Sequence, residues 1–280
     1  MAFTNFIPSV WAESINRELE RACVFVLDCN RQYEGLVSSK GDSVHILGVS
    51  KPTIKSLERE NASGQIDSAE ELEDNSVILN IDQIRYFNYM VGDIDGAQAV
   101  GGIMDVLTRE TSQGLANEMD KYIAGMATDA SVTKLNSTPT IVTKDNVLSI
   151  LDDAIEKLQE NDVSMASGVV VTVSPRFYKL FKQAHISQGT DNSDFLQNGK
   201  VAYYGNVLVR LSNNVAKTDD GATDNIMIRT TKAIAFVNPV THTEAYRPEK
   251  SFADAVKGYA LFDGKVVRPK EIININVKYA

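Results

Sequence analysis

Residues 97–126, AQAVGGIMDVLTRETSQGLANEMDKYIAGM, contain the strongest local pattern of the sequence. Mostly apolar residues recur there at steps of three or four: Ala97, Val100, Met104, Leu107, Thr111, Leu115, Met119, Tyr122 and Met126. Such steps place side chains on one face of an α-helix, so the pattern predicts one long amphipathic helix. About thirty residues at 1.5 Å per residue give a length of about 45 Å, more than most single globular domains need. We therefore expect a structural spine.

Three glycines, Gly101, Gly102 and Gly114, lie inside this helical pattern. Each lowers helix propensity by about 1 kcal/mol relative to alanine and leaves room for curvature. One interpretation is that the glycines let the spine bend. The alternative is that another part of the backbone packs closely against them.

The segment before the spine, residues 33–92, predicts a long β-hairpin, because apolar strand-like runs enclose a very polar middle. Residues 57–75 contain seven acidic residues and a single arginine, Arg59, which gives this middle a charge of −6. A segment of this composition cannot bury enough apolar area to order itself. It is either a surface loop or an arm that becomes ordered against another subunit.

A mixed α/β region follows the spine. Residues 144–159 predict a helix capped by Thr143, and residues 168–173 predict a buried strand. Ser174 then caps a further helix over 175–184, with a proline in its first turn.

The two ends of the sequence have different patterns. The first residues predict an extended arm and a short helix, in which Trp11 either anchors a neighbouring surface or packs in the core. Strands and polar loops continue from residue 203 to the end, and Pro269 marks the start of a closing strand with period-two alternation.

Common catalytic and metal-binding signatures are absent from the sequence: there is no GxxxxGK[ST], HExxH or GxSxG motif. The three histidines lie far apart, and Cys23 and Cys29 fit neither a redox pair nor a zinc-ligand set. Asp95 is better explained as a helix N-cap than as part of a calcium loop. We therefore expect no enzyme activity, no cofactor and no bound metal.

Composition limits the partners and the compartment. The chain has 280 residues, 43% of them hydrophobic, and a formal charge of −9, so any contact with nucleic acid should be local or loose. No run of eighteen apolar residues occurs, and the first thirty residues carry charge where a signal peptide would be apolar. We expect a protein of the cytoplasm that does not associate with membranes.

The order of these parts resembles the Hong Kong 97-type major capsid proteins of tailed bacteriophages, an α+β fold. Three local stretches are similar to that family: FIPSVW at 6–11, VTVSPRFY at 171–178, and VRP with EII at 267–273. The likeness covers essentially the whole chain. These motifs are structural rather than catalytic, so the assignment depends on their order.

The resemblance implies a division of the chain into the parts of that fold. These are an N-terminal arm (1–32), an E-loop hairpin (33–92), a peripheral domain with the spine helix (93–130), an axial domain (131–240), return strands of the peripheral domain (241–267), and a closing strand of the axial domain (268–280).

The resemblance also implies a function and partners. The chain would assemble with itself through pentamers and hexamers into an icosahedral head around double-stranded DNA, within a host bacterial cytoplasm. Because the arm starts at Phe3, we expect either a separate scaffolding protein or none, together with a portal and decoration proteins. An isopeptide cross-link through Lys51 or Lys55 is not expected. The alternative within the fold is an encapsulin-like nanocompartment shell.

Two hypotheses concern assembly. The acidic hairpin middle, with Glu58, Glu70, Glu71, Glu73 and Asp74, would meet a neighbour's residues 247–270, which carry +3 and include Arg247, Lys250 and Arg268. In addition, the spine glycines would let the helix bend in a precursor shell and straighten on expansion.

Overall fold

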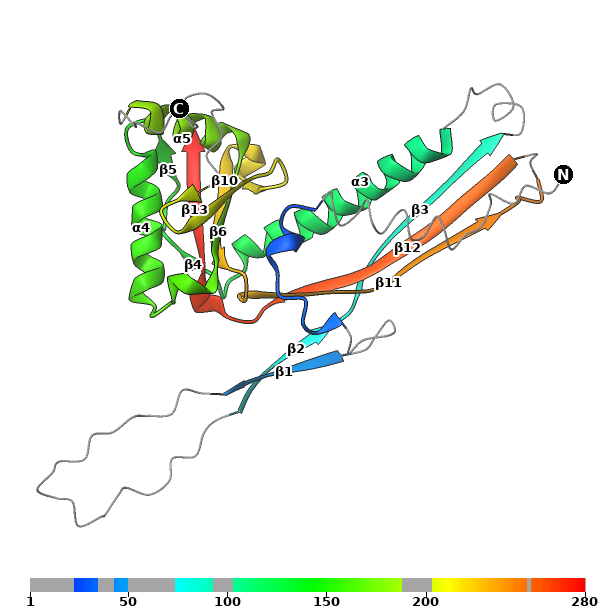
Figure 1. The fold of residues 1–280 in the computed structure, drawn as a ribbon, viewed down its shortest axis with the longest axis horizontal. Coiled ribbons are helices and arrows are strands. Elements are labelled where there is room, and N and C mark those ends of the chain that lie inside the picture. Colours follow the sequence, from blue (N-terminus) through cyan, green and yellow to red (C-terminus); the bar gives the residue numbers. More distant parts are fainter. Residues whose placement is uncertain are drawn as a thin grey trace, which may run out of the picture.

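The computed structural model describes residues 23–34, 43–49, 74–92, 103–187, 203–250 and 253–279. These residues form a compact body, an elongated body beside it, and a projecting two-stranded hairpin (Figure 1). The observed mixture of helices and sheets agrees with the predicted α+β class. The division of the chain into arm, E-loop, peripheral and axial domains stays a prediction.

The elongated body consists of helix α3 (Ile103–Gly125) and an antiparallel sheet of three strands. The strand order is β11 (Ile234–Tyr246), β12 (Ala253–Val266) and β3 (Gln83–Gly92), so β12 is central. Figure 1 shows α3 running along this sheet. The helix predicted from the three-and-four spacing is thereby confirmed over its described residues.

Helix α3 packs closely on β12 near its C-terminal end. Gly264 permits this approach, because a Cβ at that position would lie 2.9 Å from Ile123 Cδ1 and 2.9 Å from Met126 Cε. The ring of Tyr122 meets the ring of Phe262 edge-on, with centroids 5.7 Å apart. Of the apolar stripe read from the sequence, Leu115 and Met119 are buried, whereas its other described members are half-buried.

The hairpin consists of β1 (Ser43–Val49) and β2 (Asp74–Asn80). Its root is held by a small apolar cluster, in which side chains of the hairpin and of β11 and β12 pack together: Val44, Ile46, Leu79, Ile81, Ala235, Val237 and Leu261. The apolar run at 86–91, expected in the hairpin, belongs instead to β3 and pairs with β12. Its alternation predicts a strand but does not identify the pairing partner, which is distant in sequence.

The compact body is built on an eight-stranded mixed sheet in the order β4-β13-β10-β6-β8-β7, with β5 beside β13 and β9 beside β10. Helices α4 (Val147–Glu160) and α5 (Pro175–Ser187) pack with it (Figure 1). The strands are β4 (Thr133–Lys134), β5 (Thr140–Val142), β6 (Val169–Val173), β7 (Tyr203–Tyr204), β8 (Val207–Leu211), β9 (Ala216–Thr218), β10 (Thr223–Thr230) and β13 (Ile272–Tyr279). Short 3-10 turns are η1 (Val26–Asp28), η4 (Met126–Thr128), η5 (Met165–Ser167), η6 (Asp219–Gly221) and η7 (Pro269–Glu271).

The local predictions for the compact body are confirmed except for one helix cap. Strand β6 is buried throughout, and Ser174 caps α5 by accepting the N–H of Phe177 at 3.3 Å. The prediction of Thr143 as the cap of α4 is wrong, because the N-cap is Asn146. Thr143 donates its backbone N–H to Asn146 Oδ1 at 2.8 Å, which forms a turn ahead of the helix.

Candidate assembly surfaces

The outer face of the three-stranded sheet carries large apolar side chains in contact with solvent. We call Ile84, Tyr86 and Met90 of β3 and Tyr259 of β12 the outer strip; their exposed fractions are 36%, 81%, 65% and 40%. Alternate residues of a strand point to the same face, and Tyr259 is paired directly with Tyr86. The aromatic side chains of two strands therefore form one continuous surface.

A row of polar groups crosses the outer strip between Tyr86 and Met90. Lys257 Nζ lies 3.2 Å from Glu244 Oε2 and 4.9 Å from the ring centroid of Tyr246. The hydroxyl of Tyr246 donates to Asn88 Oδ1 at 3.1 Å. Exposed apolar side chains gathered on one face in this way are typical of a surface that binds another protein.

Strand β3 also lies at the edge of its sheet. Within the described part of the chain, β12 is the only strand that pairs with it. An edge strand presents backbone N–H and C=O groups that can pair with a further strand. The elongated body thus offers both an apolar face and a hydrogen-bonding edge.

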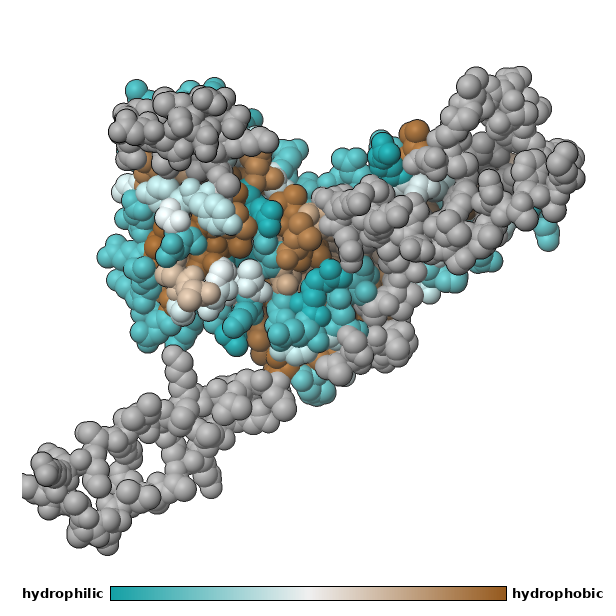
Figure 2. Space-filling view, viewed as in Figure 1, coloured by the Kyte–Doolittle hydropathy of each residue, from teal (hydrophilic) through white to brown (hydrophobic). Residues whose placement is uncertain are grey.

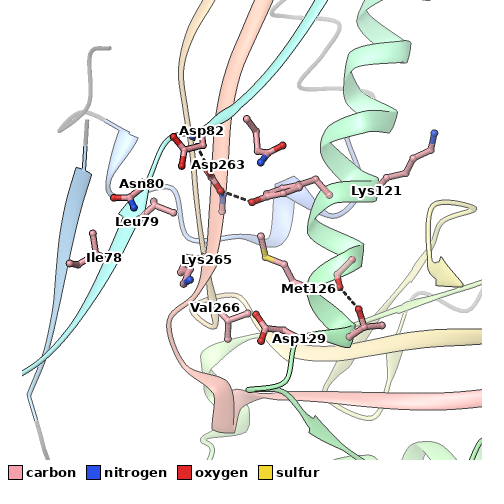
Figure 3. Close-up of a pocket in the computed structure, with 15 residues that line it drawn as sticks. Ile78, Leu79, Asn80, Asp82, Lys121, Met126, Asp129, Asp263, Lys265 and Val266 are labelled. Atoms are coloured by element: carbon pink, nitrogen blue, oxygen red, sulfur yellow. Dashed lines mark hydrogen bonds between the residues drawn. The ribbon is translucent and has the colours of Figure 1, made fainter. Parts of the chain in front are cut away.

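An open groove of about 660 Å³ lies between α3, β12 and the end of β2 (Figure 3). Its deepest charged group is Asp263, which is 6% exposed. Asp263 accepts the hydroxyl of Tyr122 at 2.6 Å and the backbone N–H groups of Gly264 at 2.7 Å and Asp82 at 3.1 Å. The carboxylate therefore fastens the turn after β2 to β12 and α3.

The groups in this groove do not converge as in a catalytic pocket. Figure 3 shows Lys121 extending away from Asp263, on the far side of α3. Burial and the neighbouring Asp263 raise the pKa of Tyr122, so its hydroxyl stays a donor to that carboxylate. The hydrogen bonds of Asp263 are structural.

Among the described residues no cluster of three or more histidine, cysteine or acidic side chains suits a metal ion. Within the same residues, no helix has the length and apolar character that a membrane crossing requires. Cys23 and Cys29 are buried. Most of the coloured surface in Figure 2 is hydrophilic, and hydrophobic side chains show on the compact body and between it and the elongated body.

Most of the predicted assembly residues lie outside the described part of the chain: Trp11, Glu58, Glu70, Glu71, Glu73, Gly101 and Gly102. Asp74 is the first residue of β2, and its Cα is paired with that of Val49 at the outer end of the hairpin. The rest of the acidic middle lies outside the described residues.

The predicted basic residues are not gathered in one place. Arg247 and Lys250 follow β11 and are exposed, at one end of β12. Arg268 follows the opposite end of β12, and its Nη1 lies 2.9 Å from Glu271 Oε1. Positive charge in this region is thus spread along the elongated body.

Gly114 is exposed on α3, and a Cβ at this position would meet no atom within 4 Å. The alternative of close backbone packing therefore does not apply to Gly114. The interpretation that it permits bending stays a prediction.

Sequence reasoning missed the outer strip. Its signal was present as the alternation of Ile84, Tyr86 and Met90, but the run was interpreted as hairpin. Since both faces of β3 carry large side chains, alternation alone does not reveal which face another element covers.

No protein-family model matches the chain, and no curated protein matches it either. Solved structures do match. A structure from Mycobacterium phage Che8 has a TM-score of 0.75 and 29% identity, with 90% of each chain covered. The capsid of the cyanophage P-SCSP1u has a TM-score of 0.67 and 17% identity, covering 92% of this chain and 88% of that chain.

A virus-like particle from Pyrococcus furiosus has a TM-score of 0.61 and 10% identity, covering 95% of this chain and 98% of that chain. These likenesses show that the chain has the fold of phage capsid proteins. The resemblance to phage capsid proteins predicted from the sequence is thereby confirmed, whereas the assignment to the Hong Kong 97 type stays a prediction.

Proposed function

We propose that this chain is the major capsid protein of a tailed bacteriophage. It assembles through pentamers and hexamers into an icosahedral head around double-stranded DNA. The observation that carries the proposal is the fold shared with phage capsids over nine-tenths of the chain. The exposed outer strip supports it, because a subunit of a shell needs apolar surface that only neighbouring copies cover.

The protein acts as a structural element and not as an enzyme. Its main partner is itself, and it works with a scaffolding protein and a portal. With a charge of −9, it contacts the packaged DNA only loosely. Assembly takes place in the host cytoplasm, and the finished protein resides in the virion.

The hairpin of one subunit lies over the elongated body of its neighbour. Two-stranded hairpins are marginally stable alone in water, so a hairpin that leaves its own subunit needs a second surface. The acidic middle at 57–75 is drawn to Arg247 and Lys250, while the outer strip supplies apolar contact. Each ion pair contributes about 0–1 kcal/mol, but repetition over many copies fixes the register.

A second candidate function is that of a nanocompartment shell like an encapsulin. The likeness to the virus-like particle from Pyrococcus furiosus, which covers nearly the whole of both chains, favours this alternative. The contents of the purified particles distinguish the two functions: a phage head holds DNA of uniform length, whereas a nanocompartment holds protein.

Electron microscopy of the purified full-length protein tests the proposal. We expect closed shells, or pentamers and hexamers, in the wild type. Replacing two residues of the outer strip, Tyr86→Ser with Met90→Ser, should leave the circular dichroism spectrum unchanged and abolish closed shells. Val106→Ser on α3, which removes an exposed apolar side chain outside the strip, is the matched control and should still assemble. A wild-type protein that stays monomeric at all concentrations, both alone and with its scaffolding protein, would refute the proposal.

A further inference from the structure

Residues 23–30, which we call the strap, run between the two bodies before the hairpin begins (Figure 1). Its apolar side chains enter the core: Cys23, Phe25, Val26 and Cys29 are buried, and Leu27 faces solvent. At its centre the backbone forms the single turn η1. Backbone groups of such a short turn need partners from elsewhere in the molecule.

Helix α3 supplies partners for the N–H groups of the strap. Asp120, which is 1% exposed, accepts the N–H groups of Val24 at 2.8 Å, Phe25 at 2.9 Å and Val26 at 3.3 Å. Burial raises the pKa of Asp120, while the three N–H groups and the positive Arg229 act against that rise. A remote carboxylate therefore caps the turn.

The sheet of the compact body supplies partners for the carbonyl groups. Arg229 of β10 is 1% exposed; its Nη1 donates to the carbonyl of Asp28 at 2.5 Å and its Nη2 to the carbonyl of Phe25 at 2.7 Å. The same turn is thus held by a buried negative group of α3 and a buried positive group of β10.

Two further attachments extend this connection. Arg210 of β8 donates through Nε and Nη2 to the carboxylate of Asp28, at 3.1 and 3.2 Å. Asn30 exchanges backbone hydrogen bonds with β11, donating to Ile234 at 2.8 Å and accepting from Phe236 at 2.9 Å. The strap therefore contacts α3, the compact sheet and the long strand β11.

We infer that the strap is a clamp that fixes the angle between the compact and elongated bodies, with Asp120 and Arg229 as its two buried anchors. A rotation of one body against the other would break the hydrogen bonds that Asp120 or Arg229 forms with the backbone of the strap. A buried charge without partners is strongly unfavourable, so intermediate angles are disfavoured. The two bodies also share one apolar core, to which the buried charged groups add a requirement for fixed hydrogen-bond geometry.

This inference concerns the single subunit and does not depend on the proposed function. Distances between spin labels on unassembled subunits test it. Labels are placed at Glu110→Cys on α3 and Glu156→Cys on α4, both exposed, whereas the native thiols are buried. The unmodified clamp should give one narrow distance distribution.

Two variants release the clamp at different ends. Asp120→Asn replaces a carboxylate that accepts three N–H groups, and Arg210→Met removes the half-exposed partner of Asp28. Both should broaden the distance distribution and speed amide exchange at 24–26. Arg268→Met, which breaks the ion pair with Glu271 and touches no residue of the strap, is the control and should change neither quantity.

Two results would overturn the inference. One is a distance distribution that stays narrow in both variants although amides 24–26 exchange faster. The other is amide exchange that does not change in either variant. If the variants fail to fold, amide exchange in the wild-type protein remains a test. Its amides at 24–26 should exchange as slowly as those of β10, and faster exchange would refute the clamp.

Discussion

Gly258 of β12 lies directly against the ring of Phe87 on β3. A Cβ at Gly258 would lie 2.5 Å from Phe87 Cζ and 2.6 Å from the carbonyl oxygen of His242 on β11. The side chain of Phe87 thus occupies the space above the central strand, in the layer between the sheet and α3. A residue with a side chain at position 258 would push against both neighbouring strands.

The first prediction concerns this contact. Gly258→Ala should lower the free energy of unfolding by about 1–3 kcal/mol, because the backbone oxygen of His242 cannot move aside as a flexible side chain would. Gly114→Ala is the matched control: the site is open and helical, so alanine should raise stability by about 0.5–1 kcal/mol. Urea unfolding followed by circular dichroism measures both, and shifts of the same sign would contradict the packing argument.

Ser174 holds two groups at once. Its hydroxyl oxygen caps α5 through Phe177 N–H and lies 2.8 Å from the hydroxyl of Tyr279 on β13. Ser174→Ala should destabilise the compact body by about 0.5–2 kcal/mol through loss of the cap. Ser174→Thr keeps the hydroxyl and should restore most of this loss in the same unfolding measurement.

Stability should fall in strongly alkaline solution. Burial and the carboxylate of Asp152 raise the pKa of Tyr204 to about 12, and burial also raises the pKa values of Tyr122 and Tyr279. The unfolded chain loses these protons first, near pH 10, so their stabilising contribution is present below about pH 10 and disappears as pH rises through the folded pKa. Tyrosinate absorbance during a pH titration should show late-titrating tyrosines, and Asp152→Asn should make one of them titrate earlier.

The charge of the hairpin middle should control assembly. Replacing Glu70, Glu71 and Glu73 with glutamine should reduce the yield of shells. It should also weaken the dependence of that yield on salt, because salt can screen the attraction between subunits only while the charges are present. A control with equal loss of charge, Asp145→Asn, Asp153→Asn and Glu156→Gln on the compact body, should assemble normally. Equal behaviour of the two triple variants would exclude guidance by the hairpin.

The glycines of the spine predict an effect on maturation. If Gly101, Gly102 and Gly114 allow bending, alanine at all three should block or shift the expansion of a precursor shell. The diameters of particles before and after expansion, measured by electron microscopy, provide the test. Normal expansion of the triple variant would show that bending there is not required.

Local patterns predicted the helices well but not all of the pairing. The three-and-four spacing around Leu115 and Met119 predicted α3, and Ser174-Pro175 predicted the start of α5. The partner of β3 was not predictable, because β12 is far away in sequence and alternation on β3 is compatible with several pairings.

The candidate surfaces were harder to predict than the fold. The buried anchors of the strap were also not predictable. Asp120 and Arg229 bind mainly backbone groups of the strap, so no pair of oppositely charged side chains in the sequence points to these contacts. Arg229 also follows Ile228 in a strand that is buried throughout. A charged residue at such a position needs a specific partner, but the sequence does not show which group that partner is. The exposure of Tyr86 depends on which face α3 covers, and only the tertiary arrangement determines that.

Strand β12 has a mechanical consequence. It is bonded to a strand on each side, and beyond Pro269 the chain continues into β13, next to β10 in the compact sheet. Tension applied along the elongated body is therefore carried by the covalent backbone into the centre of the compact sheet. Because ladder hydrogen bonds lie perpendicular to the strands, such a load shears many of them together instead of unzipping them one by one. In the proposed shell, the wall would therefore resist stretching most strongly along the direction of β12.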